Sequence, residues 1–143
     1  MIDNVYSKAV IVYLAGPYSN DAPKNPSKRS SVEKRLARFN AITEAARQLI
    51  EQGNIVYSPL TMTHPIDIRM KHDPGSAFWV AFDEAFMAHC SRLIVLRLPG
   101  WDASSGVSKE IDFFGKRGIL PEWSDPANFG INEDSAEFAA AFD

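Results

Sequence analysis

The chain has 143 residues, 45% of them hydrophobic, which suits one compact domain with a buried core. The formal net charge of −3 argues against nucleic acid as the main partner, although a local basic cluster could still bind a small anion. A single cysteine excludes a disulfide framework, no apolar run approaches the roughly 20 residues of a membrane span, and the N-terminus has no signal-peptide pattern. We therefore expect a cytoplasmic protein that acts on a small molecule, without a nucleic-acid or membrane partner.

The first half of the chain predicts a strand, a loop, a long helix and a second strand. Residues 8–15 (KAVIVYLA) are apolar and β-branched, and the polar segment 20–29 follows them. Ser30 and Glu33 form a capping box that would start the helix, and Gly53 would end it. The second strand is predicted over residues 54–58 (NIVYS). The apolar positions of the helix have helical spacing: Val32, Leu36, Phe39, Ile42, Ala46, Leu49 and Ile50.

The second half continues this alternation. Residues 60–75 have no periodicity and are expected to be irregular. Residues 76–90 predict a helix that is apolar nearly all round, and such a helix is either well buried or part of an oligomer interface. The remaining elements are, in order, a strand over 92–98, a helix over 104–117, a short strand over 118–121, a loop over 122–132, and a terminal helix or frayed end over 134–142.

Strands that alternate with helices predict an α/β fold: a doubly wound, mainly parallel sheet of the flavodoxin or Rossmann-like type, with helices on both faces. The whole chain, 1–143, would form this single domain, and 121–143 would be a tail, a lid or a dimer arm. Ligands of such sheets bind at the carboxyl ends of the strands. We therefore expect the site in the loops 16–29, 59–75 and 99–105.

The segment LRLPGWDASSGVSKE, residues 96–110, predicts a strand end, a tight loop and a helix that carries a carboxylate. Ser104 or Ser105 would cap this helix, and Gly106 would let a ligand approach the backbone. The N–H groups of a helix start favour an anion. Glu110 lies four residues after Gly106 and faces the same side, which suits a nucleophile or a base; the alternative is a solvated helical glutamate.

Asp83 is the second candidate acid. Its neighbours at helical spacing are apolar or aromatic: Trp79, Val80, Phe86 and Met87. Such surroundings desolvate a carboxyl group and raise its pKa, as happens at functional sites and also at structural hydrogen bonds. The adjacent Glu84 is a rival that the spacing does not exclude. Glycosidic bond cleavage needs two carboxyl groups, one to attack the anomeric carbon and one to help the leaving group depart.

Aromatic and basic side chains supply the other candidates. Tyr13, near the end of the first strand, is either a core aromatic or a phenol that hydrogen-bonds the nucleophile or the substrate. Arg35 could bind phosphate in a fork at the same strand ends, or it could be solvated. Tyr18, Trp79 and Trp101 could stack on a nucleobase, or could pack in the core or in a lid.

The sequence carries no motif for a metal or a cofactor. His64, His72 and His89 form no ligand pattern with Cys90 or with the carboxylates, and neither GxxxxGK[ST] nor GxGxxG occurs. We therefore expect neither a metal nor a cofactor.

Four segments in this order resemble the nucleoside 2-deoxyribosyltransferase superfamily, and the resemblance extends from Val10 to about Leu120. The segments are YLAGPY at 13–18, GNIVYSP at 53–59, Asp83 within its apolar helix, and SSGVSKE at 104–110. The last segment follows the family pattern of a small or acidic residue, a glycine, and a nucleophilic glutamate six residues after the first.

The resemblance implies that Glu110 forms a covalent glycosyl intermediate at C1′, that Asp83 orients it or assists departure of the base, and that Tyr13 hydrogen-bonds near it. At the position of Ser104, the transferases typically carry an aspartate for the sugar 5′-hydroxyl. The branch similar to 2′-deoxynucleoside 5′-phosphate N-hydrolase carries a serine that contacts phosphate. The residues expected to bind substrate are Gly16, Pro17, Tyr18, Ser19, Arg35, His64, Trp79, Trp101, Ser104, Ser105 and Gly106.

The expected function is therefore that of an N-glycosidase that cleaves the base–sugar bond of a (deoxy)nucleoside 5′-monophosphate, without a cofactor, in a homodimer or larger homo-oligomer. Two features depart from the hydrolase branch: Ser19 stands where the hydrolases carry an arginine, and the loop after the third strand is longer, as in small bacterial and phage members with an LPGW-type loop. A deoxyribosyltransferase and a non-catalytic nucleotide-binding module are the alternatives. A phosphoribohydrolase of the lysine-decarboxylase-like type ranks lower, because its PGGxGTxxE pattern has only Ser105-Gly106 as a counterpart.

Overall fold

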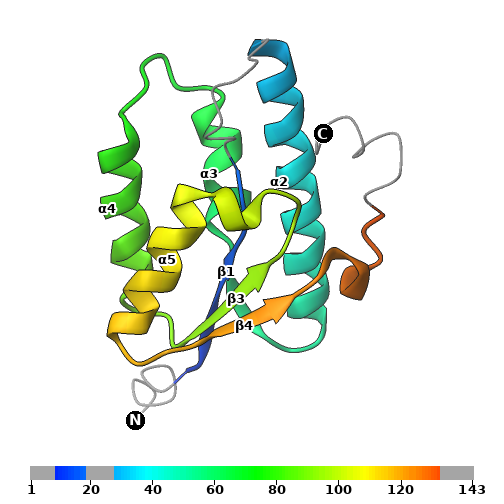
Figure 1. The fold of residues 1–143 in the computed structure, drawn as a ribbon, viewed down its shortest axis with the longest axis vertical. Helices are drawn as coiled ribbons and strands as arrows, with labels where there is room; N and C mark the ends of the chain where they lie inside the picture. The colour runs from blue at the N-terminus through cyan, green and yellow to red at the C-terminus, as the bar shows by residue number, and fades with distance from the viewer. Residues whose placement is uncertain (1–8, 19–27, 133–143) are drawn as a thin grey trace.

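A computed structural model describes residues 9–18 and 28–132, which form an α/β structure of helices packed on a parallel sheet (Figure 1). Within these residues, four parallel strands lie in the order β2-β1-β3-β4, which confirms the expected fold class. In chain order the elements are β1 (Ile11–Ala15), α2 (Lys28–Glu51), β2 (Ile55–Tyr57), α3 (Pro59–Asp67), α4 (Ser76–Met87), β3 (Arg92–Leu96), a 3-10 helix (Trp101–Ala103), α5 (Ser105–Lys116), β4 (Pro121–Ser124) and a second 3-10 helix (Pro126–Phe129).

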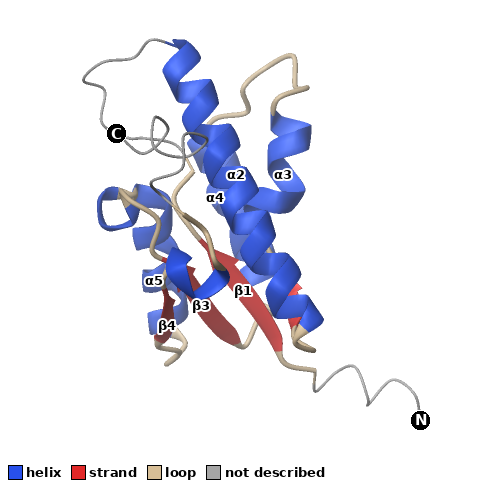
Figure 2. Cartoon of the chain, turned by 90° about the vertical axis from the view of Figure 1, so that its right-hand side faces the viewer, coloured by secondary structure: helices blue, strands red, loops and turns tan. Residues whose placement is uncertain are grey.

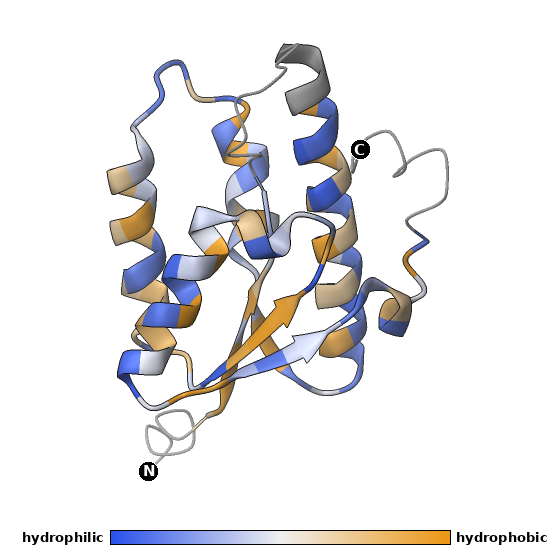
Figure 3. Cartoon of the chain, in the orientation of Figure 1, coloured by the Kyte–Doolittle hydropathy of each residue, from blue (hydrophilic) through white to orange (hydrophobic). Residues whose placement is uncertain are grey.

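The two central strands, β1 and β3, are buried on both faces, and their successive side chains enter different core clusters because they point to opposite sides. Val12 and Leu14 share one core cluster with α2, whereas Tyr13 and Ala15 share a second cluster with residues of α4 and α5. The sheet therefore lies between α2 on one side and α4 and α5 on the other (Figure 2). In Figure 3, β3 is a hydrophobic strand, which is typical of a parallel strand covered on both faces. No helix in the described ranges is long and apolar enough to cross a membrane.

The middle of the sheet contains the point at which the chain changes direction. β1 and β3 are neighbours, with Tyr13 paired to Leu93. The chain leaves β1 through α2 to reach β2 at one edge, and leaves β3 through α5 to reach β4 at the other. A crevice forms at the carboxyl ends of two strands whose connections diverge in this way, and doubly wound folds bind their ligands there. The fold therefore predicts a ligand site at the loops that follow β1 and β3.

One buried side chain of α2 joins these two loops. Arg38 is 4% exposed, and its guanidinium donates Nη1 to the carbonyl of Tyr18 at 3.1 Å and Nη2 to the carbonyl of Pro99 at 3.2 Å. Gly100 makes the second contact possible, because a Cβ at that position would lie 3.0 Å from Nη2 of Arg38. The two loops at the carboxyl ends of β1 and β3 are therefore held at a fixed distance from each other.

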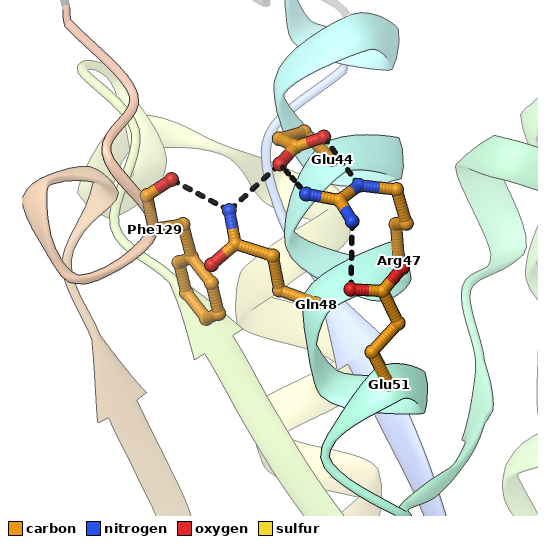
Figure 4. Close-up of polar contacts among 5 residues, drawn as sticks. All are labelled: Glu44, Arg47, Gln48, Glu51 and Phe129. Atoms are coloured by element: carbon orange, nitrogen blue, oxygen red, sulfur yellow. Dashed lines mark hydrogen bonds and ion pairs between the residues drawn. The ribbon is translucent and has the colours of Figure 1, made fainter.

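The last described segment is also anchored to α2 (Figure 4). Gln48 donates its side-chain Nε2 to the carbonyl of Phe129 at 2.7 Å and to Glu44 at 2.7 Å. Arg47 pairs with Glu44 at 2.7 Å and with Glu51 at 2.8 Å, on the exposed side of the same helix. This network fixes the second 3-10 helix against the face of the sheet that α2 covers, where Phe129 joins the core.

Two expectations for the helices were wrong. The capping box at Ser30 does not start the long helix, because α2 begins at Lys28. The segment 60–75 is not irregular throughout, because its first part forms α3, with Pro59 in the first turn, where a missing N–H costs nothing. Pro65 lies inside α3 and removes one helical hydrogen bond, but packing of α3 against α2 maintains the helix.

The fourth strand lies later in the chain than the predicted 118–121. Gly118 has φ +75° and follows the end of α5, so it belongs to the turn, and β4 begins at Pro121. A proline is tolerated at the first residue of a strand, where its missing N–H is not needed. The predictions for residue 8, for 19–27 and for 134–142 lie outside the described residues.

The apolar helix α4 is not buried by the rest of the described chain. Only Met87 among its residues is fully buried, whereas Phe78 is 47% and Phe86 is 37% exposed. The sequence predicts that this helix is either well buried or part of an oligomer interface. The first alternative, burial within the chain, is therefore wrong. The helix nevertheless packs on α5 and forms one wall of the crevice described below.

Two glycine substitutions test the constraint on the loop after β3. Gly100 has φ +91°, so Gly100→Ala is expected to lower the free energy of unfolding by roughly 1–3 kcal/mol through backbone strain and the contact with Arg38. Gly115 lies inside α5, where an added Cβ meets nothing within 4 Å, so Gly115→Ala is expected to raise it by about 0.5–1 kcal/mol. Chemical denaturation measures both, and effects of the same sign would contradict this account.

Candidate functional site

A cavity of about 350 Å³ opens at the carboxyl ends of β1 and β3. Its volume lies within the range of sites for small organic ligands. Its walls come from the loop after β1, from α2, α3 and α4, and from the first two turns of α5. The lining residues are Gly16, Tyr18, Arg35, Pro59, Leu60, Thr63, Asp67, Asp73, Ser76, Trp79, Val80, Asp83, Glu84, Met87, Ser104, Ser105, Gly106, Lys109 and Glu110.

Glu110 reaches this cavity because of how α5 begins and which face it buries. Ser104 is the N-cap, and its Oγ accepts a hydrogen bond from the Val107 N–H at 3.2 Å. Val107 and Phe114 lie buried against the sheet, and Glu110 lies between them along the helix. Its side chain is therefore only 9% exposed. Burial raises the pKa of Glu110 from 4.5 to about 8, with a further rise from Asp83 and an opposing effect of the Tyr13 hydroxyl.

Asp83 faces the same cavity from α4. Burial alone raises the pKa of Asp83 from 3.8 to about 6. Glu84, the rival to Asp83, also lines the cavity, but it is exposed. Between pH 6 and pH 8 the pair therefore holds one proton and one negative charge, with the proton mainly on Glu110, and because the two groups interact the proton can pass between them. One carboxylate and one carboxylic acid are thus available together at neutral pH.

The buried Tyr13 and the half-buried Tyr57 lie close to this pair. Tyr13 is fully buried on β1, and its ring contacts those of Tyr57 and Phe114 at centroid distances of 5.9 and 5.7 Å. Within the described residues, the hydroxyls of Tyr13 and Tyr57 have no partner at hydrogen-bonding distance. Burial raises the pKa of both hydroxyls, and the neighbouring acids add to the effect: Glu110 and Asp83 for Tyr13, Asp83 for Tyr57. Both phenols therefore remain protonated in the neighbourhood of the acids.

The start of α5 forms the part of the cavity that is best suited to an anion. Ser104 accepts a hydrogen bond from α5 through its oxygen, so its own O–H proton can be donated to a ligand. Ser105 and Gly106 present the first backbone N–H groups of the helix, and Lys109 lies one turn further on. On the other side, Arg35 lies over the ring of Tyr18, 5.8 Å from its centroid.

Tyr18, His64 and Asp67 form a polar cluster next to the cavity. The Tyr18 hydroxyl lies 2.6 Å from Nδ1 of His64 and donates to Asp67 at 3.3 Å. Burial lowers the pKa of His64. Since the single proton of the Tyr18 hydroxyl goes to Asp67, Nδ1–H of His64 donates to the Tyr18 oxygen. The His64 ring also stacks on Phe39 at 4.5 Å. His64 lies outside the lining, and it positions Tyr18 and does not face the ligand directly.

The structure brings most of the predicted substrate-binding residues to one cavity, but not all of them. Pro17 is fully buried and outside the lining, and Trp101 packs against Trp123 at 5.2 Å. Tyr13 lies behind Glu110, and Ser19 lies outside the described residues. The predicted residues that line the cavity are Gly16, Tyr18, Arg35, Trp79, Asp83, Ser104, Ser105, Gly106 and Glu110.

Several lining residues were not predicted individually, although Thr63, Asp67 and Asp73 lie in the segment 59–75 where the site was expected. Lys109 is adjacent to Glu110, and its charge gave no signal beyond that of other helical lysines. Thr63 and Asp67 lie four residues apart on α3 and therefore share one face, a signal that a helical prediction for this segment would have revealed. Asp73 lies in the loop between α3 and α4. Within the described residues, no group of His, Cys, Asp and Glu is arranged to hold a metal ion.

The free-energy cost of burying the ionisable Glu110 can be measured from the pH dependence of the free energy of unfolding. Because the pKa of Glu110 is raised to about 8 in the folded state, ionisation opposes folding, and this residue's contribution to stability falls as the pH rises from 4.5 to 8. Glu110→Gln removes the ionisable group. Relative to the wild type, the variant is therefore expected to gain roughly 2–4 kcal/mol in the free energy of unfolding between pH 5 and pH 8. Urea titrations at both pH values measure this, and a difference that does not change with pH would contradict the burial of an ionisable Glu110.

Comparison with known proteins gives the chain a family. No curated protein matches the sequence. A family model described as "Domain of unknown function (DUF1937)" matches residues 10–125, a range that includes the four strands and both candidate acids. The chain therefore belongs to the DUF1937 family.

Proposed function

We propose that this protein is an N-glycosidase that cleaves the base–sugar bond of a (deoxy)nucleoside 5′-monophosphate through a covalent glycosyl intermediate on Glu110. The observation that carries the proposal is the pair formed by Glu110 and Asp83. Two carboxyl groups from different helices share one cavity, their pKa values are about 8 and about 6, and together they hold one proton at neutral pH. Glycoside cleavage with a covalent intermediate requires one ionised and one protonated carboxyl group.

The proposed reaction has two steps. The proton of the pair first passes from Glu110, whose pKa is the higher, to Asp83. The Glu110 carboxylate then attacks C1′, the bond between C1′ and the base nitrogen breaks, and its electron pair leaves with the base. Asp83 in its protonated form donates its proton to the departing base. Water then attacks C1′ of the glycosyl ester, Asp83 takes the proton, and Glu110 is released as a carboxylate. Tyr13 lies beside Glu110 and, as a protonated phenol, would donate to the carboxylate oxygen that does not attack.

The start of α5 supports the choice of a monophosphate. The N-terminus of α5, the Ser104 hydroxyl and the Lys109 ammonium line the same part of the cavity. A phosphate there would accept hydrogen bonds from the helix start and would be attracted by Lys109. An aspartate in place of Ser104 would repel it. Arg35, at the edge of the cavity, is a second cation within the described lining.

A transferase would use the same first step and replace water by a second base. A nucleotide-binding module without activity would not need two acids with raised pKa values in one cavity, since burying them costs stability. The experiment that tests the proposal separates these possibilities as well.

The test is the release of free base from ribo- and deoxyribonucleoside 5′-monophosphates and the matching nucleosides, followed by chromatography. We expect release from at least one monophosphate, and a rate at least 100-fold lower for Glu110→Ala, which lacks the attacking group. Asp112→Asn, a change at an exposed position of α5, is the control and should retain the wild-type rate. No release with or without an added acceptor base would contradict both enzymatic readings, and release only with an acceptor would identify a transferase.

The proposed enzyme assembles as a homo-oligomer through α4. This helix carries Asp83 on its cavity side and exposes Phe78, Phe86 and three alanines at 77, 81 and 85. Alanines and phenylalanines at helical spacing form two adjacent stripes, and a second copy of the helix could pack a phenylalanine stripe on an alanine stripe. Such contact would remove the apolar surface from water.

Light scattering during size-exclusion chromatography tests this assembly. The wild type is expected to elute as a dimer or a larger oligomer, and Phe78→Lys is expected to shift the equilibrium toward the monomer because a charge would enter the apolar interface. The matched control is Ile68→Lys, at an exposed isoleucine that follows α3. A monomeric wild type, or equal effects of the two lysines, would contradict the proposed interface.

A further inference from the structure

The cavity has a second end, formed by the last turn of α3 and by the loop between α3 and α4. This loop lies at the top of Figure 1, beyond the start of α5. Thr63 and Asp67 contribute from α3, and Asp73 contributes from the loop. Trp79 and Val80 on α4 and Leu60 on α3 add apolar surface to the same cavity. A flat heterocycle with polar edges fits such a combination of apolar walls and a few polar groups.

Three polar side chains at this end, those of Thr63, Asp67 and Asp73, can accept hydrogen bonds but have no proton left to donate, whereas Ser76 at the start of α4 adds a hydroxyl that can do both. Asp67 uses Oδ2 to accept from the Tyr18 hydroxyl at 3.3 Å, and Asp73 uses Oδ1 to accept from the Gly75 N–H at 2.8 Å. In the described part of the chain, the other oxygen of each carboxylate makes no hydrogen bond. The Thr63 hydroxyl donates its only proton to the carbonyl of Pro59 at 2.8 Å, so its oxygen is left as an acceptor.

The charges of the lining agree with this pattern. The described lining has five carboxyl groups and two cations, Arg35 and Lys109. Lys109 lies at the α5 end, where the phosphate is proposed to bind, and Arg35 lies over the ring of Tyr18. A ligand group that approaches Asp67 and Asp73 therefore meets negative charge and unpaired acceptors. A donor such as an amino group would be favoured there, whereas a carbonyl oxygen would be repelled.

We infer that this end of the cavity selects a nucleobase with an exocyclic amino group, of the cytosine or adenine type, over the corresponding oxo base. The inference rests on the proposed function, since it places the base of a nucleotide between Trp79 and the two aspartates. Asp67 and Asp73 accept from the amino group through their unbonded oxygens. An oxo base presents a carbonyl at the same point, which leaves these carboxylates without a donor and adds repulsion between lone pairs.

The test uses two pairs of nucleotides that differ at one group: dCMP against dUMP, and dAMP against dIMP. Binding is measured by titration calorimetry to Glu110→Gln, which retains the cavity but lacks the attacking carboxylate. We expect each amino nucleotide to bind at least tenfold more tightly than its oxo partner. Equal binding within the pairs, tighter binding of the oxo members, or no binding of any of the four would overturn the inference.

Substitutions added to Glu110→Gln show which residues cause the preference for an amino base. Asp67→Asn, combined with Glu110→Gln, replaces one acceptor by an amide that can also donate, so the ratio within each pair should fall at least threefold. Asp112→Asn in the same background removes the same charge from an exposed position of α5, and the ratio should remain unchanged. A ratio that survives Asp67→Asn and Asp73→Asn together would overturn the assignment to these aspartates.

Measuring hydrolysis of the same four nucleotides by the wild type distinguishes a failure of the base preference from a failure of the proposed function. If all four nucleotides are hydrolysed with the same kcat/KM, the proposed function stands and the base preference is overturned. If none is hydrolysed but the amino members bind preferentially to Glu110→Gln, the preference stands and the proposed activity toward these nucleotides fails.

Discussion

Burial of the Glu110 carboxyl against the sheet is the constraint on which the site depends. The start of α5 at Ser104 and the packing of Val107 and Phe114 fix the rotation of the helix, and this rotation places Glu110 next to Tyr13 and Asp83. The position is unfavourable for a charge, because desolvation raises the pKa of both acids. This cost in stability is the feature that supports the proposed reaction of the two carboxyl groups.

Much of the fold and the two candidate acids could be predicted from the sequence. Short β-branched runs between amphipathic segments determine a doubly wound sheet, and Glu110 and Asp83 follow from helical spacing because each lies beside an apolar stripe. Helix α3 could not be predicted in this way. Pro59 and Pro65 give the segment the composition of a loop, and only packing against α2 makes it helical. Asp67 was therefore missed together with the helix that carries it.

Other differences between the expected and the observed positions have the same origin, since tertiary contacts decide what local spacing leaves open. Trp101 is of a residue type that often stacks on ligands, but its ring packs against the ring of Trp123 on β4. His64 was predicted to bind substrate, and the structure gives it a supporting position behind Tyr18. Arg38 gave no signal at all, because a helical arginine is usually solvated. Its burial becomes evident only when the loops after β1 and β3 are placed on either side of it.

This arginine has a consequence for how the family can vary. The guanidinium of Arg38 bonds the carbonyls of both loops, so a change in the length or path of one loop is transmitted to the other through a rigid planar group. Insertions after β3 would need matching changes after β1, or the loss of the arginine. The loops after β1 and β3 belong to different halves of the doubly wound sheet, but they are therefore expected to change together among members of the family.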